Sequence, residues 1–301
     1  MKGTIYSLLI IFVSCTPRSQ EMTLSDLELQ ILDSIHHYEG FYGLAFKNLD
    51  DSSESIFINK KETFHAASTM KTPVMIEVFK QGFQNKFALD DSVGIKNEFS
   101  SIVDTSSYSL SPSADQNKDL YSRIGQYCPI KELVYHMITT SSNIATNMLV
   151  EMVGASNITS TMRELGATDI MVLRGVEDIK AYEAGLSNTT TAFDLMTIYE
   201  KIARKEVVSE EVCDQMITIL KDQVSNEIIP AGLPPQAEVA HKTGAITGVN
   251  HDSGVVYLPD GRKYVLVILS KDWKNPEGSI KMMANISGLI YKYMMQPSKT
   301  G

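Results

Sequence analysis

The sequence predicts an α+β fold in which strands from both ends of the chain form one sheet and the helices between them form a second lobe. Two strand-like runs lie within the first 60 residues, and three more follow residue 237. From about 69 to 219 the pattern is mainly helical, most clearly at 131–153 and 191–204, with a long irregular connection at 97–125. A sheet assembled from both termini therefore flanks an inserted set of helices.

The early elements are an amphipathic helix and a hairpin. The helix is predicted at 24–38, where Thr23 is a suitable cap and Gly40 a suitable stop. Strands are predicted at 41–48 and 55–59, around a turn rich in Asp and Ser.

The late elements are three strands and a closing helix. The strands are predicted at 238–245, 254–258 and 263–270, with the Pro-Asp-Gly at 259–261 as the turn between the last two. The chain then closes with an apolar-faced helix at 279–295.

This order of elements predicts two lobes. Residues 1–20 are expected to be a signal peptide and tether, 21–66 and 220–301 the sheet lobe, and 67–219 the helical lobe. A cleft between two such lobes is a natural place for a small-molecule active site.

Composition indicates an ordinary globular protein, with 43% hydrophobic and 21% charged residues among 301. The formal net charge is −9 and no basic stripe is present, which argues against nucleic acid as a partner. The acidity says nothing more specific, because net charge mainly affects solubility.

The N-terminus has the pattern of an export signal. Lys2 precedes an apolar run at 5–13, too short to span a bilayer, and Ser14 comes directly before Cys15. This resembles a bacterial lipoprotein signal, in which Cys15 becomes the lipidated first residue, while a simple cleaved signal is the alternative. We expect an exported, periplasmic protein that meets the membrane only through a lipid on Cys15, with 16–20 as a tether.

Two further cysteines, Cys128 and Cys213, can pair in an oxidising compartment, but their spacing leaves a disulfide open. Cys213 lies in a helical pattern and is expected to be a small buried residue. No Cys and His group has zinc spacing, and we expect neither a metal nor a cofactor.

The first chemical signal is Ser68-Thr69-Met70-Lys71, at the start of a helical stretch. The spacing places Lys71 above Ser68 on one helix face, where a desolvated lysine amine can take the serine proton. A serine that opens the helix would also have the positive end of the helix dipole facing a developing oxyanion. Alone, the motif is weak, and an ordinary capped helix would be the preferred interpretation.

The second signal, Ser141-Ser142-Asn143, is the only Ser-x-Asn in the chain and predicts a turn that enters a helix. Ser141 could relay a proton to a leaving group, and Asn143 could hold a substrate amide. A simple helix N-cap would use the same residue types.

The third signal is Lys242-Thr243-Gly244, in a strand-like run. Here a strand would bring an ammonium group and a hydroxyl to the edge of the cleft, where both suit a substrate carboxylate. Gly244 would let a ligand approach the backbone closely. The N–H groups of Ser68 and Ala245 could together make an oxyanion hole.

In this order, on a helix start, a turn and a strand, the three motifs resemble the active-site serine β-lactamase and penicillin-binding protein family. The phrase STMKTPVMIEV at 68–78 is similar to class A members in particular, and the resemblance covers nearly the whole chain after the export signal. It implies a β-lactamase/transpeptidase-like fold, with a five-stranded antiparallel sheet beside an all-helical lobe. By resemblance, Ser68 is the nucleophile, Lys71 and Ser141 relay protons, and Asn143, Lys242 and Thr243 bind substrate.

Class A members also carry a glutamate, shortly after an Arg and in a Glu-x-x-x-Asn pattern, which activates the water that frees the acyl-enzyme. Here Glu177 follows Arg174 one residue later than in that pattern, with Ala181 in place of the Asn. Glu183 is the weaker candidate. The resemblance implies Glu177 as the water-activating base, although a solvated acidic loop would explain both glutamates.

Three other positions depart from the family pattern. Ser142 and Asn188 stand where class A members usually have Asp, and no Arg follows the Lys242 motif on the next strand, where His251-Asp252-Ser253 lie. These changes leave the residues for acylation in place. Their expected effect is on the rate of deacylation, and therefore on turnover.

We therefore expect a serine hydrolase that opens a β-lactam amide through a Ser68 acyl-enzyme, with Lys71 or Glu177 as base. One alternative is a D-alanyl-D-alanine peptidase, or a related amidase or esterase, with the same motifs. Another is a β-lactam-binding sensor that acylates without turnover. The expected partner is a small β-lactam or peptidoglycan-like molecule, and the protein is expected to be a monomer.

Overall fold

The computed structural model describes residues 21–296. The predicted signal run, Cys15 and the tether at 16–20 lie outside the described residues. Among the residues that are described, no helix is long and apolar enough to cross a bilayer.

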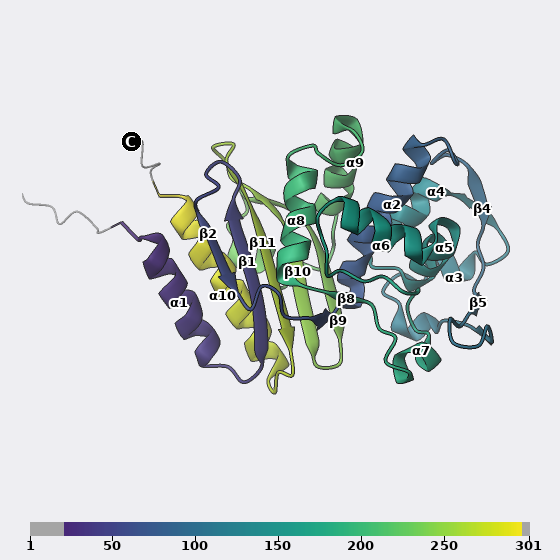
Figure 1. The fold of residues 1–301 in the computed structure, drawn as a ribbon, viewed down its shortest axis with the longest axis horizontal. Coiled ribbons are helices and arrows are strands. Elements are labelled where there is room, and N and C mark those ends of the chain that lie inside the picture. Colours follow the sequence, from purple (N-terminus) through teal and green to yellow (C-terminus); the bar gives the residue numbers. More distant parts are fainter. Residues whose placement is uncertain (1–20, 297–301) are drawn as a thin grey trace, which may run out of the picture.

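One sheet joins the two ends of the chain in the order β2-β1-β11-β10-β9, and every neighbouring pair is antiparallel (Figure 1). The N-terminal hairpin reaches the C-terminal strands through β1, whose Leu44 lies opposite Ile268 of β11. The predicted α+β class and the predicted five-stranded antiparallel sheet are confirmed. The strands are β1 (Phe41–Asn48), β2 (Ser55–Ile58), β9 (Glu238–Ile246), β10 (Val249–Tyr257) and β11 (Lys263–Lys271).

Helices cover both faces of the sheet. Phe46 belongs to a buried cluster with α1 (Leu24–His36) and α10 (Pro276–Met294), whereas its neighbour Ala45 belongs to the cluster on the other face. Successive strand side chains point to opposite faces, so one strand supplies both clusters. On the second face α8 (Ala192–Ala203) packs against β1, β10 and β11, opposite α1 and α10 in Figure 1.

The helical lobe is built around α2 (Lys71–Phe83), in which every residue from Lys71 to Phe79 is buried. This helix packs against α4, α5, α6 and α9. The helix that begins with the predicted catalytic lysine is therefore the centre of the lobe. The other helices of the lobe are α3 (Asp119–Ser122), α4 (Ile130–Thr139), α5 (Asn143–Val153), α6 (Ala155–Glu164), α7 (Ile179–Glu183) and α9 (Glu210–Lys221).

Short strand pairs and 3₁₀ turns complete the fold. The pair β3–β8 leads directly into the turn η1, which carries the predicted nucleophile. The pairs are β3 (Phe64–His65) with β8 (Thr189–Thr190), β4 (Ser92–Gly94) with β7 (Tyr127–Pro129), and β5 (Phe99–Ser100) with β6 (Ser107–Tyr108). The turns are η1 (Ala67–Met70), η2 (Pro112–Ala114) and η3 (Pro230–Gly232).

The middle of the chain differs from the prediction in three respects. The helical stretch at 131–153 is two helices, α4 and α5, because Ser141 adopts a left-handed backbone conformation (φ 55°) between them. The connection at 97–125 contains the short elements β5, β6, η2 and α3. Helix α8 falls within 67–219, the range assigned to the helical lobe, yet it packs on the sheet because its apolar face fits the strands.

The strand predicted at 254–258 begins earlier, at Val249. Gly248 has φ 79°, which glycine adopts without strain, and it turns β9 back into β10. The polar residues at 251–253 broke the alternation in the sequence, but they are buried and pair with β9 inside the sheet.

Both cysteines in the described residues, Cys128 and Cys213, are buried and free. The Cys213 thiol donates to the carbonyl of Val207 at 3.0 Å. Burial raises the pKa of both thiols, which disfavours the reactive thiolate. The expectation that Cys213 is a small buried residue is confirmed.

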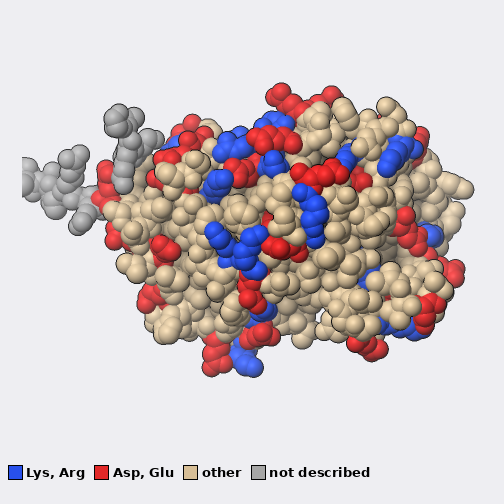
Figure 2. All heavy atoms as spheres, viewed as in Figure 1, with Lys and Arg blue, Asp and Glu red and all other residues tan. Residues whose placement is uncertain are grey.

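Charged side chains are mixed on the surface. Figure 2 shows acidic and basic groups interspersed over the face in view, without a continuous basic patch. That face therefore lacks the basic stripe that a polyanion would need.

Gly254 marks a close approach between β10 and β9. A Cβ at this position would overlap the carbonyl oxygen of Ala240 and lie 2.5 Å from Cβ of His241. By contrast, a Cβ on Gly82 of α2 would have its nearest neighbours at 3.7 Å, an ordinary contact.

We expect Gly254→Ala to lower the free energy of unfolding by about 1–3 kcal/mol, because the sheet must shift to accept the methyl group. Gly82→Ala is the matched control and should leave stability unchanged or raise it by about 0.5–1 kcal/mol. Urea unfolding of both variants measures the difference. Equal stability of the two variants would contradict the packing argument.

Candidate active site

The predicted nucleophile lies in the turn η1, directly before α2. The sequence predicted that Ser68 opens the helix; it precedes the first α-helical residue, Lys71, and is partly exposed. Ala67 has a left-handed backbone (φ 45°), which is strained for a residue with a Cβ. Its N–H donates to Nδ1 of His65 at 3.0 Å, so the turn that presents Ser68 is held from β3.

Lys71 is fully buried and directs its ammonium group at the second motif. Its Nζ donates to the Ser141 carbonyl (2.7 Å), the Ser141 hydroxyl (3.1 Å) and Oδ1 of Asn143 (2.9 Å). These three bonds use the three donors of an ammonium group, and none goes to the Ser68 hydroxyl. A neutral amine, with one proton fewer, would have a lone pair free for a neighbouring hydroxyl.

Lys242 reaches the same hydroxyl from β9. Its Nζ donates to Oγ of Ser141 at 3.1 Å and to the Thr243 carbonyl at 3.0 Å, and the side chain is fully buried. The Ser141 hydroxyl therefore lies between two lysine ammonium groups. The structure thus brings together the three motifs, although they are far apart in the sequence.

Burial changes the acidity of both lysines. It lowers the pKa of Lys71 to about 7, while the charges of Asp115 and Glu177 act in the opposite direction. Burial and the nearby charge of Lys71 lower the pKa of Lys242 well below its ordinary value, and Asp252 opposes this. A pKa near neutrality gives Lys71 both protonation states at neutral pH, which suits a general base.

Asp252 is a buried group behind Lys242 that the sequence did not single out. Its carboxylate lies 2.8 Å from Nδ1 of His241 and accepts the N–H groups of Ile229 and Ser253, each at 2.9 Å. The signal was present as the polar run in a strand whose neighbours are apolar. In the structure the charge of Asp252 favours the protonated form of Lys242, and the Ser253 hydroxyl donates to the Lys242 carbonyl at 3.3 Å.

The region where class A members carry an Arg after the third motif is occupied by a buried histidine. His251 lies opposite Gly244, and its ring nitrogens contact the carbonyls of His65 and Asn250 at 2.9 Å each. Burial lowers the pKa of His251 to about 4, so the ring is neutral at ordinary pH. It offers no positive charge to a substrate.

The edge of β9 lies against the nucleophile turn. A Cβ on Gly244 would be 3.0 Å from the backbone nitrogens of Ser68 and Thr69, so a larger residue would fit here only if the neighbouring backbone moved by a few tenths of an ångström. Thr243 is partly exposed and Ala245 is exposed along this edge strand. The strand that carries the third motif is thus seated beside Ser68, as the sequence predicted.

The loop from Arg174 to Asn188 is closed by a side-chain amide. Oδ1 of Asn188 accepts the N–H groups of Leu173 (2.8 Å) and Arg174 (3.2 Å), and its Nδ2 donates to the Arg174 carbonyl at 2.9 Å. The buried guanidinium of Arg174 donates to the carbonyl of Leu186 at 2.9 Å. The amide therefore ties both ends of the loop.

Glu177 enters the site from this loop. Its Oε1 accepts a hydrogen bond from Nδ2 of Asn143 at 2.8 Å. Asn147 holds the preceding residue, Val176, by its N–H (2.6 Å) and its carbonyl (3.0 Å), and Glu177 then adopts a left-handed backbone (φ 60°). Glu177 is thus hydrogen-bonded to the predicted site residue Asn143, although it lies one position later than in the family pattern. Glu183, the weaker candidate, is exposed.

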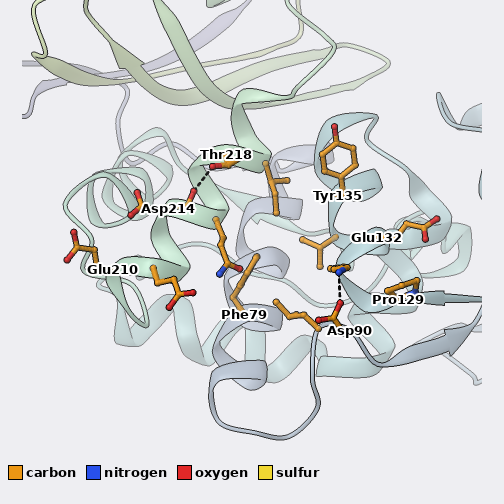
Figure 3. Close-up of a pocket in the computed structure, with 14 residues that line it drawn as sticks. Phe79, Asp90, Pro129, Glu132, Tyr135, Glu210, Asp214 and Thr218 are labelled. Carbon is orange, nitrogen blue, oxygen red and sulfur yellow. Dashed lines mark hydrogen bonds and ion pairs between the residues drawn. The ribbon is translucent and has the colours of Figure 1, made fainter.

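A large groove lies elsewhere, in the helical lobe. It has a volume of about 1200 Å³ and is formed by α2, α4 and α9, with Phe79, Tyr135 and Thr218 among its walls (Figure 3). It contains none of the predicted site residues. Volume alone therefore does not locate the reactive groups in this fold.

One group of side chains in the described residues has metal-like spacing, Asp119, Glu132 and His136. The guanidinium of Arg123 already binds both carboxylates, at 3.0 Å from Asp119 and in close contact with Glu132. An arginine thus already pairs with both carboxylates, and this group contains none of the predicted site residues.

Comparison with known proteins identifies the family. The model of the β-lactamase enzyme family matches residues 26–294. The chain belongs to this family. It is 25% identical to a β-lactamase of Bacteroides uniformis over 98% of this chain and 100% of that protein. It is 26% identical to the extended-spectrum β-lactamase PER-1 of Pseudomonas aeruginosa, over 89% of this chain and 86% of that protein.

Solved structures of the β-lactamase fold superpose over most of the chain. PBP-A is 28% identical with a TM-score of 0.77, covering 91% of this chain and 97% of its own. A mutant of PBP-A, with a TM-score of 0.76, is an acyl-enzyme complex with penicillin-G. The extended-spectrum β-lactamase TLA-1, 19% identical with a TM-score of 0.78 over 90% and 99%, shows the shared fold. The predicted family, the fold and the β-lactamase-type serine hydrolase class are confirmed.

The acidity of Lys71 in this β-lactamase family member can be measured directly. In protein labelled with ¹³C-lysine, we expect the Lys242 signal to titrate below the ordinary lysine pKa of about 10.4, and the Lys71 signal to titrate near pH 7. Lys71→Arg should remove that signal. An ordinary titration for every lysine would contradict the buried, partly neutral Lys71.

Proposed function

We propose that the protein hydrolyses the amide of β-lactams through an acyl-enzyme on Ser68. The observation that carries this proposal is the Ser141 hydroxyl, which lies 3.1 Å from both Lys71 and Lys242 beside the nucleophile turn. Membership of the β-lactamase family and the acyl-enzyme complex of the PBP-A mutant support the same substrate class.

In the first half of the reaction, Oγ of Ser68 attacks the β-lactam carbonyl carbon and its proton passes to the neutral amine of Lys71, or to Glu177. The N–H groups of Ser68 and Ala245 would stabilise the oxyanion. The C–N bond then breaks, and the Ser141 hydroxyl passes a proton to the leaving nitrogen. Because Ser141 contacts Lys71, it can be reprotonated from that ammonium group. If Glu177 is the first acceptor of the Ser68 proton, that proton passes on to Lys71, so that Glu177 is again a carboxylate before the second half of the reaction.

Substrate binding is assigned to the edge of β9 and the start of α5. Lys242 and Thr243 would bind the substrate carboxylate, and Gly244 permits close approach of the ring to the backbone. The Asn143 amide would contact the substrate side-chain amide. Without an arginine on β10, carboxylate recognition depends on Lys242 and Thr243.

In the second half, Glu177 takes a proton from a water that attacks the ester carbonyl carbon. The bond between that carbon and Oγ of Ser68 then breaks, and the proton passes from Glu177 to Oγ, which restores the Ser68 hydroxyl and the Glu177 carboxylate. The hydrogen bond of 2.8 Å between Glu177 and Asn143 supports this role, because it fixes the carboxylate beside the acylation residues. An exposed loop position, such as that of Glu183, would lack this restraint.

The test follows intact mass and colour together after the protein is mixed with a chromogenic cephalosporin. We expect sustained colour with a transient adduct for the wild type and neither for Ser68→Ala. One equivalent of colour with a persistent adduct would instead indicate stable acylation, the penicillin-binding alternative. No adduct at all would contradict the proposal and direct the search to peptide and ester substrates.

The same assay separates the two glutamates. Glu177→Gln should accumulate the acyl-enzyme and slow turnover by about 10²–10⁴-fold, because the water loses its base. Glu183→Gln is the matched control and should behave as the wild type. If both variants turn over equally, Glu177 is not the water-activating base.

We further propose export with a lipid on Cys15, supported by Lys2, the apolar run at 5–13 and the small residue before the cysteine. In a bacterial host, the full chain should fractionate with membranes, and Cys15→Ser should release it from them. Equal membrane association of both forms would contradict the lipid anchor.

A further inference from the structure

The second motif departs from the family pattern at its centre, where Ser142 replaces the usual Asp. Ser142 is fully buried and forms the N-cap of α5, with its hydroxyl accepting the N–H of Ala145 at 3.4 Å. A serine cap carries no charge. The buried turn therefore lacks, within the motif itself, the carboxylate of the class A pattern.

The connection at 97–125 places a carboxylate, that of Asp115, at this turn. Asp115 follows the turn η2 and is only 5% exposed. Its Oδ2 accepts the N–H of Asn143 (2.6 Å), the N–H of Ile144 (3.3 Å) and the hydroxyl of Ser142 (3.2 Å). One oxygen thus satisfies the first two amides of α5 and the capping hydroxyl.

The Asp115 side chain is itself held in place. The Tyr121 hydroxyl of α3 donates to Oδ2 at 3.3 Å, and the N–H of Asn117 donates to Oδ1 at 3.2 Å. Asn117 in turn contacts Nδ1 of His136 on α4 at 2.8 Å. The Asp115 carboxylate therefore accepts five hydrogen bonds while buried, which fixes its position in the site.

We propose that Asp115 is a positioning residue for acylation, replacing from outside the motif the aspartate that Ser142 displaces and fixing the turn that presents Ser141 and Asn143 to Lys71. The proposal rests on the function proposed above. Asn143 links Asp115 to the reactive groups, because its N–H is bound by Asp115 while its side chain contacts Lys71 and Glu177.

The carboxylate also acts on Lys71 through its charge. The charged groups that face Lys71 are Asp115, Glu177 and Lys242, from three separate segments. Of the two carboxylates, Asp115 contributes more to keeping the pKa of Lys71 from falling further. Loss of the negative charge would favour the neutral amine.

The test begins with Asp115→Asn, which keeps the shape and an acceptor oxygen but removes the charge. In ¹³C-lysine-labelled protein, the titration of Lys71 should move down by about one pH unit. The acidic limb of kcat/KM for a chromogenic cephalosporin should move in the same direction. Asp119→Asn, an exposed change on the same segment, is the control and should move neither.

A second pair of variants tests whether Asp115 takes the place of an aspartate at position 142. Asp115→Ala should lower the acylation rate constant by about 10- to 100-fold, because the turn is released. Adding Ser142→Asp to that variant should restore most of the rate, since an aspartate N-cap can bind the freed amides.

Two results would overturn the proposal: an unchanged Lys71 titration in Asp115→Asn, or failure of Ser142→Asp to rescue a folded Asp115→Ala protein. The titration needs no substrate. Absence of β-lactam turnover in the wild type would therefore defeat the proposed function and leave this measurement of Asp115 intact.

Discussion

Two lysine ammonium groups, those of Lys71 and Lys242, are fully buried and donate to one hydroxyl, that of Ser141. Burial of a charge costs several kcal/mol unless opposite charges and hydrogen bonds compensate. Carboxylates near the pair provide this compensation, Asp115 and Glu177 for Lys71 and Asp252 for Lys242. Because these groups come from separate segments, the reactive arrangement exists only when the sheet, the helical lobe and the loop are all in place.

Three residues of the site segments have a strained backbone. Left-handed conformations at Ala67, Ser141 and Glu177 each cost about 1–3 kcal/mol for a residue with a Cβ. Each is held by neighbours: His65 binds the N–H of Ala67, the lysines bind Ser141, and Asn143 binds the Glu177 carboxylate. The packed fold therefore sustains a geometry that the isolated segments would not adopt.

Hydrogen bonds of the folded chain hold the segments that depart from the family pattern. At position 142, where an aspartate is absent, the Ser142 hydroxyl donates to the carboxylate of Asp115. Asn188 closes its loop with a side-chain amide that both accepts and donates hydrogen bonds. Glu177 lies one residue later than in the family pattern, but it has a left-handed backbone and its carboxylate binds the side chain of Asn143.

The sequence by itself determined the α+β class, the joining of both ends in one sheet and the three motifs, because these depend on local periodicity and on residue types at short spacing. It did not reveal the roles of Asp115 and Asp252, or that Glu177 rather than Glu183 contacts the site, because those depend on long-range packing. The helix break at Ser141 and the early start of β10 were also decided by tertiary contacts, with Lys71 and with β9. Hydrogen bonds between segments more than 100 residues apart, such as Lys242 to Ser141, leave no periodic signal, so only the folded chain shows them.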